Sequence, residues 1–96
     1  MKFQVEVPNL VLEEVGDAVL YYDSLQKDLG NKLYDDFEST LLSIEKSPLL
    51  FQRVHKNYRH AMLCRFPYLV IFRVFETKIL INRFIHAKKQ PAKRYK

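Results

Sequence analysis

Several residue types are scarce in this sequence of 96 residues, and each scarcity excludes a class of protein. The single cysteine, Cys64, cannot form an internal disulfide or build a zinc cluster by itself. Two glycines and four prolines exclude a collagen-like or low-complexity chain. Apolar runs such as residues 68–72 are far shorter than the roughly 20 residues that span a bilayer. Since the N-terminus also lacks an apolar run, we expect a cytoplasmic protein with no membrane contact.

Positive charge is unevenly distributed along the chain. Residues 1–48 contain no arginine and four lysines against ten acidic residues, which gives a net charge of −6. Residues 49–96 contain six lysines and six arginines against Glu76 alone, which gives +11. This excess is larger than solubility requires. We therefore expect the second half to form a continuous positive surface that binds a polyanion, either a nucleic acid, a nucleoprotein or an acidic protein segment.

Hydrophobic periodicity predicts a strand followed by two helices in the first half. Polar and apolar residues alternate over residues 2–7, which is the period of a half-buried strand. Apolar residues then recur at helical spacing over residues 11–25, with Asn9 as the expected N-cap, and again over residues 33–44. Residues 28–31 supply turn chemistry between them. Because the turn is short, we expect the two helices to lie antiparallel.

The second half has the composition of strands. Segments rich in β-branched and aromatic residues predict three or four short antiparallel strands, over residues 51–54, 58–65, 68–75 and 78–86. The last two are nearly all apolar, so we expect them at the centre of the sheet. The order β-α-α-β-β-β(-β) predicts an α+β fold in a single domain over residues 1–96, with an antiparallel helical hairpin packed on a twisted, mainly antiparallel sheet of four to five strands. Residues 87–96 form a basic C-terminal tail.

Five short segments, taken in their order and spacing, carry a family resemblance. They are Tyr21-Tyr22, Ser47-Pro48, Tyr58-Arg59, the run from Arg65 to Phe72, and the strand from Ile79 to His86 with residues 88–91 after it. The chain resembles the RelE/ParE superfamily over essentially its whole length. The resemblance implies a toxin of a type II toxin–antitoxin module, also called a plasmid-stabilisation protein. Such a toxin inhibits bacterial growth and is neutralised by a cognate antitoxin, which we expect to present acidic and apolar side chains.

The resemblance leaves the target open. RelE-like members are endoribonucleases that mostly cut messenger RNA on the ribosome, whereas ParE-like members poison DNA gyrase and are not nucleases. RelE-like ribonucleases usually carry an arginine in the strand that corresponds to residues 68–72, where this chain has Leu69. We therefore favour gyrase poisoning slightly. Metal-independent, ribosome-dependent mRNA endoribonuclease activity is the alternative, and a non-toxic interaction module is the third hypothesis.

The two activities call for different site residues. RNA cleavage without a metal requires a base, an acid and cations around the phosphate. The catalytic candidates for that chemistry are His86, Arg83 and Tyr95. The candidates for binding the target or its phosphates are Arg59, Arg65, Arg73, Lys88, Lys89, Lys93 and Arg94. Arg83 and His86 are three residues apart, so they lie on opposite faces of a regular strand and converge only where the strand bulges. We expect no metal site and no cofactor.

Overall fold

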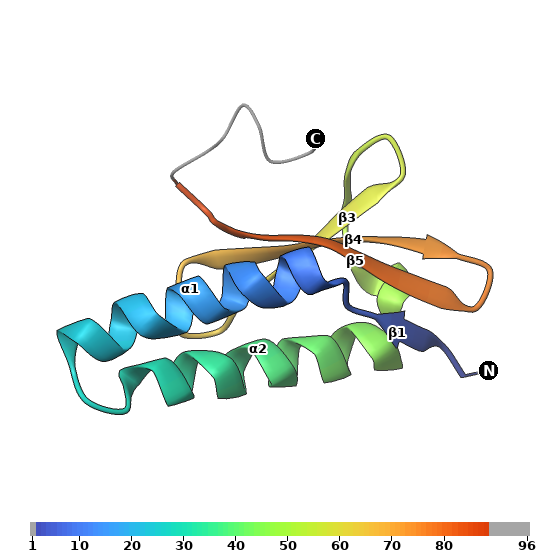
Figure 1. The fold of residues 1–96 in the computed structure, drawn as a ribbon. Helices are drawn as coiled ribbons and strands as arrows, with labels where there is room; N and C mark the ends of the chain where they lie inside the picture. The colour runs from blue at the N-terminus through green and yellow to red at the C-terminus, as the bar shows by residue number, and fades with distance from the viewer. Residues whose placement is uncertain (1, 89–96) are drawn as a thin grey trace.

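The computed structural model describes residues 2–88, and two helices pack on one face of a single sheet (Figure 1). This arrangement confirms the predicted α+β fold class. The elements follow one another as β1 (Gln4–Glu6), α1 (Asn9–Leu25), α2 (Leu29–Lys46), the 3-10 turn η1 (Pro48–Leu50), β2 (Arg53–His55), β3 (Tyr58–Met62), β4 (Tyr68–Phe75) and β5 (Lys78–His86).

The sheet has five strands in the order β1-β5-β4-β3-β2. Strands β2 to β5 form an antiparallel meander, whereas β1 pairs parallel to β5 through Gln4 and Lys78, Val5 and Ile79, and Glu6 and Leu80. The mainly antiparallel sheet is therefore confirmed, with β5 and β4 inside it as expected. Because β1 ends opposite Leu80, the second half of β5 has no strand on its outer side in residues 2–88.

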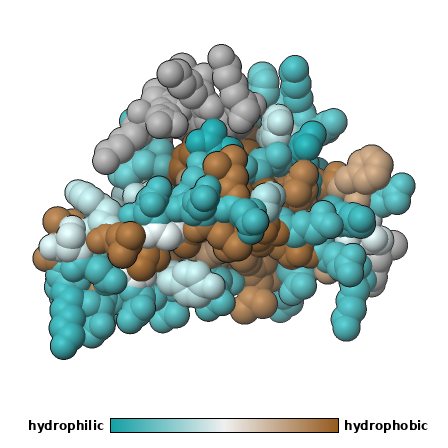
Figure 2. Space-filling view, viewed as in Figure 1, coloured by the Kyte–Doolittle hydropathy of each residue, from teal (hydrophilic) through white to brown (hydrophobic). Residues whose placement is uncertain are grey.

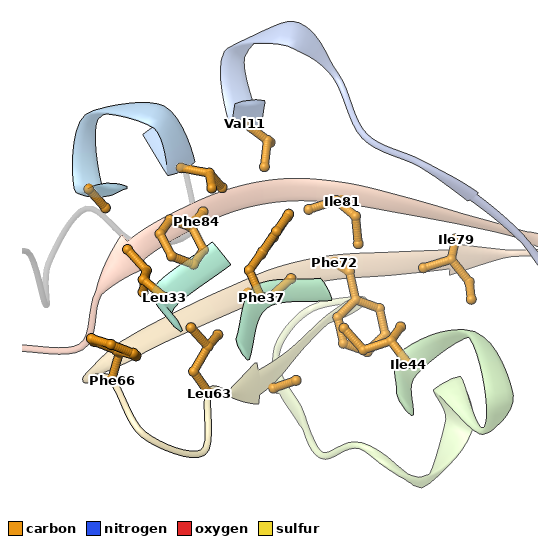
Figure 3. Close-up of a cluster of buried hydrophobic side chains, with 14 residues drawn as sticks. Val11, Leu33, Phe37, Ile44, Leu63, Phe66, Phe72, Ile79, Ile81 and Phe84 are labelled. Carbon is orange, nitrogen blue, oxygen red and sulfur yellow. The ribbon is translucent and has the colours of Figure 1, made fainter. Parts of the chain in front are cut away.

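The core lies between the helices and the sheet (Figure 3). Helical spacing brings Val11, Val15 and Ala18 of α1 onto one buried stripe. The stripe of α2 packs beside it and meets the buried side chains of β4 and β5. The members labelled in Figure 3 are Val11, Leu33, Phe37, Ile44, Leu63, Phe66, Phe72, Ile79, Ile81 and Phe84. Figure 2 shows hydrophobic side chains in the middle of the same view as Figure 1, with hydrophilic side chains around them.

The turn between the helices differs from the prediction. Gly30 is not a turn residue but belongs to the first turn of α2, which begins at Leu29. A Cβ atom at Gly30 would lie 2.5 Å from the Val19 carbonyl oxygen, so the glycine allows α2 to approach α1 closely. The Gly30 amide donates to Oδ1 of Asp23 at 2.7 Å. The predicted N-cap of the first helix is also wrong, because Asn9 is already helical and Pro8 precedes it.

A β-bulge interrupts the pairing of β4 with β5. Ile71 pairs with Arg83 and Phe72 pairs with Ile81, so Asn82 is an extra residue on β5. The insertion shifts the alternation of side chains by one position. Consequently Ile81 and Phe84 both join the core under the helices, although they are three residues apart.

The face of the sheet away from the helices carries its own apolar cluster. Leu69, Ile71 and Ile85 are buried there, with Tyr58 and Ala87 packed against them. Strand alternation explains the division, because Val70 and Phe72 belong to the core on the other face. Among residues 2–88, no helix is long and apolar enough to cross a membrane.

Candidate functional site

His86 lies at the end of β5, opposite Tyr68 at the start of β4. The two rings meet edge to face, with 5.2 Å between their centroids. Nδ1 of His86 accepts the backbone amide of Lys88 at 3.1 Å. An imidazole that accepts at Nδ1 carries its proton on Nε2 when neutral, so Nε2 is the donor nitrogen of this ring. The Lys88 side chain is exposed beside this ring.

Tyr68 belongs to a cluster of aromatic rings at this end of the sheet. Its ring is stacked on Phe84 at 4.7 Å and meets Tyr22 edge to face at 6.2 Å. Burial raises the pKa of the Tyr68 phenol, and the nearby Tyr22 hydroxyl and its hydrogen bond raise it further. Tyr68 therefore stays protonated at neutral pH, and its hydroxyl can act as a hydrogen-bond donor rather than as a base.

Arg83 forms an ion pair with Glu14 of helix α1. Its Nε donates to Oε2 of Glu14 at 2.8 Å, and Oε1 of the same carboxylate accepts the Phe84 amide at 3.0 Å. That amide points to the outer side of β5, beyond the end of β1, so Glu14 of α1 satisfies the sheet edge. The bulge at Asn82 immediately precedes Arg83 and Phe84 on β5.

Arg59 has a structural role in the chain. Its Nη1 donates to the Phe51 carbonyl oxygen at 2.6 Å and lies 3.4 Å from the Leu49 carbonyl oxygen. These bonds attach β3 to the segment around η1. One nitrogen of the guanidinium predicted to bind phosphate thus bonds to backbone oxygens of the chain itself.

Two further arginines lie at separate places. Arg65 is exposed in the β3–β4 loop, beside a depression of about 420 Å³ that it shares with Lys32 and Asp35. Arg73 is exposed on β4, with its guanidinium carbon 5.3 Å from the centre of the Tyr58 ring. The two cations occupy different pockets of the molecule.

The cations predicted to bind the target do not all gather at one place within residues 2–88. Arg59 and Arg83 bond to groups of the fold, while Arg65, Arg73 and Lys88 lie at separate locations. The physical reason is that buried or half-buried oxygens of the chain itself satisfy part of the charge excess. The predicted residues Lys89, Lys93, Arg94 and Tyr95 lie outside the described residues.

Asp36 is a residue that the sequence analysis missed. It is buried on α2, and its two carboxylate oxygens accept the amides of Cys64 and Arg65 at 3.1 and 2.8 Å. The carboxylate thereby holds the β3–β4 loop against the helices. A signal was present in the sequence, since Asp36 is an acidic residue at the inward spacing of Leu33 and Thr40. Residues 2–88 contain no group of three His, Cys, Asp or Glu side chains placed to hold a metal ion.

Comparisons with known proteins agree with the geometry of the fold. No protein-family model matches the chain. It is 29% identical over 92 residues to proteins named toxin ParE2 from two strains of Mycobacterium tuberculosis, a match that covers 95% of this chain and 88% of theirs. A solved structure of the chromosomal ParDE toxin–antitoxin system from P. aeruginosa superposes with a TM-score of 0.79 at 16% identity, covering 91% of this chain and 98% of that chain. The structural match shows that the chain shares the fold of that protein, and the alignment shows that it is similar to the ParE2 toxins over nearly its whole length.

Proposed function

We propose that this protein is the toxin of a type II toxin–antitoxin module, that it poisons DNA gyrase, and that a cognate antitoxin neutralises it. Relatives named toxin ParE2 align with almost the full chain, which supports the toxin assignment. The structural neighbour belongs to a ParDE toxin–antitoxin system, which supports an antitoxin as the partner.

The choice of gyrase over RNA rests mainly on one observation, which is that within residues 2–88 Arg83 and Arg59, two of the cations predicted for RNA cleavage, bond to groups of the fold. Leu69, where ribonuclease relatives usually carry an arginine, is buried in the apolar cluster on the sheet face away from the helices. Arg83 is paired with Glu14, and Arg59 bonds to backbone oxygens. A phosphorane-like transition state needs positive charge within hydrogen-bond distance, so this arrangement favours a poison that works by binding.

The decisive experiment is to express the toxin alone and then with its antitoxin. We expect growth arrest by the toxin alone, accumulation of cleaved DNA–gyrase complexes with purified gyrase, and intact transcripts. His86→Ala should retain the growth arrest, because binding does not require proton transfer. Cleaved transcripts together with normal gyrase activity would instead assign the ribonuclease function. Normal growth on expression of the toxin alone would favour the non-toxic interaction module.

One feature keeps RNA cleavage as the second candidate function. The imidazole of His86, the phenol of Tyr68 and the exposed Lys88 are neighbours at one end of the sheet. An imidazole and an ammonium group are suitable for proton transfer and charge stabilisation. If this group cuts RNA, His86→Ala should abolish transcript cleavage while antitoxin binding survives.

Positive charge directly after β5 should also affect growth inhibition and the rate at which the antitoxin binds. Reversal of charge at Lys88 and Lys89 should lower growth inhibition and slow antitoxin association about tenfold at low salt, because charge steers encounter. Lys27→Glu, at the exposed turn between the helices, is the control and should change the association rate less than twofold. The difference should shrink as salt is added. Equal growth inhibition and equal association rates in all variants would exclude this end of the chain from recognition.

A further inference from the structure

The opposite end of the sheet carries a pocket that the proposed function does not use. A cavity of about 300 Å³ opens where the β4–β5 turn meets β1 and the β2–β3 turn. It is lined by Glu6, Asn57, Arg73, Phe75, Lys78 and Leu80. Phe75 pairs with Lys78 at one end of the β4–β5 ladder, and Tyr68 pairs with His86 at the other. Seven steps along a strand separate these ends by about 24 Å, so the pocket is distinct from the His86 site.

Two cations at the pocket are available to a ligand. Arg73 and Lys78 are both exposed, and within residues 2–88 the ion pair that forms is Arg83 with Glu14, which involves neither of them. The Arg73 guanidinium is held over the Tyr58 ring at 5.3 Å. The Tyr58 ring is itself nearly parallel to that of His55, with 6.5 Å between centroids. Arg73 is therefore oriented before any ligand binds, which lowers the entropic cost of binding an anion.

An exposed aromatic ring lies at the same pocket. Phe75 is 71% exposed, although phenylalanine is usually buried in a soluble domain. A ring in this position offers a flat apolar surface on which a nucleobase can stack. Removal of such a stacking side chain typically costs roughly five- to a hundredfold in affinity.

The carboxylate of Glu6 limits the class of ligand that the pocket can bind. Its carboxylate lies on β1, opposite Leu80 and on the lining of the pocket that holds Arg73 and Lys78. A carboxylate repels a simple anion but can accept two hydrogen bonds from the adjacent N1–H and amino group of guanine. The pocket thus combines an anion site, a stacking surface and an acceptor, which together match the three parts of a nucleotide.

We propose that this pocket binds a nucleotide. Arg73 and Lys78 bind the phosphate, Phe75 stacks on the base, and Glu6 accepts hydrogen bonds from the amino-bearing edge of guanine. The inference does not depend on the proposed function, because it involves other residues at the far end of the sheet. Free mononucleotides and nucleotides within a single strand share this chemistry.

The test is a binding titration of the full chain with GMP, UMP, inorganic phosphate and a fluorescein-labelled single-stranded oligonucleotide containing guanine. We expect GMP to bind at least tenfold more tightly than phosphate. Arg73→Gln and Lys78→Gln should each weaken GMP binding about tenfold, and Phe75→Leu about fivefold. Lys56→Gln is the matched control, since Lys56 is an exposed cation of the neighbouring turn that does not line the pocket, and it should change binding less than twofold. Glu6→Gln should reduce the preference for GMP over UMP.

The outcomes separate the sources of the ligand. Binding of GMP with this pattern of variants identifies a free nucleotide, and binding confined to the oligonucleotide with the same pattern identifies a single strand. The proposal is overturned if neither probe binds, if phosphate binds as tightly as GMP, or if Lys56→Gln weakens binding as much as Arg73→Gln. Because all substituted side chains are exposed, thermal unfolding of each variant should match the parent. The gyrase assay is a separate readout, so failure of nucleotide binding would leave the proposed function intact.

Discussion

The two ends of the β4–β5 hairpin differ in how far their aromatic side chains are buried. At the end where β4 begins, Tyr68 lies against Phe84, Tyr22 and His86. At the turn end of the same strand, Phe75 remains 71% exposed. The β3–β4 loop and the helices enclose the first end, where Tyr68 packs with the core. Phe75 at the open second end follows Val74 of that core, so strand alternation places it on the face away from the helices. Burial along these strands is therefore set by neighbouring elements as well as by residue type.

Truncation of a phenylalanine at each end should give the largest difference in stability between the two ends. Phe84→Ala removes a ring that is 2% exposed, so we expect the free energy of unfolding to fall by about 3–5 kcal/mol. Phe75→Ala should change it by no more than about 0.5 kcal/mol, because the ring has little burial to lose. Urea denaturation of both variants measures the difference. Equal losses would show that the open end is packed in solution.

The enclosed end should also depend on the Asp36 carboxylate. Asp36→Ala leaves the Cys64 and Arg65 amides without their acceptor, and we expect a loss of about 2 kcal/mol in the free energy of unfolding. Asp35→Ala is the control, since Asp35 is the exposed neighbour on the same helix and should cost less than about 0.5 kcal/mol. If the two variants have the same stability, Asp36 does not hold the loop.

The smallest expected effect is an alkaline loss of stability at the enclosed end. Burial raises the pKa of Tyr68 above its ordinary value of 10.0, so the folded state retains a proton that the unfolded state releases. Stability should therefore fall as the pH rises above 10, and Tyr68→Phe should reduce the slope of that fall. Denaturation midpoints at pH 9 and pH 11 provide the measurement. An unchanged slope in the variant would assign the alkaline loss to other groups.

The sequence predicted the elements better than the site. The predicted strands at residues 68–75 and 78–86 coincide with β4 and β5, whereas the strand predicted over 58–65 ends at Met62. It ends early because Asp36 holds the amides of Cys64 and Arg65 in the loop. The prediction for the turn between the helices placed Gly30 outside α2, because helical spacing does not reveal how closely two helices approach.

The sequence identified the candidate cations but not the groups to which they bond. Charge counts identified Arg59 and Arg83, yet both bond to oxygens of the chain itself. The pocket at Phe75 was missed because its lining comes from segments that are far apart in the sequence. The exposure of Phe75 cannot be read from alternation, because the buried residues Leu69 and Ile71 lie on the same face of β4.

Local patterns in the sequence determined the family resemblance, the order of helices and strands, and the charge contrast between the two halves. The tertiary structure decided which of those charges remain free. The Arg83 guanidinium pairs with Glu14 across 69 residues, and the Asp36 carboxylate accepts the backbone amide of Arg65 across 29, which leaves the Arg65 guanidinium exposed. Periodicity records only contacts within a few residues, while such long-range pairs form when packed elements bring distant groups within hydrogen-bond distance.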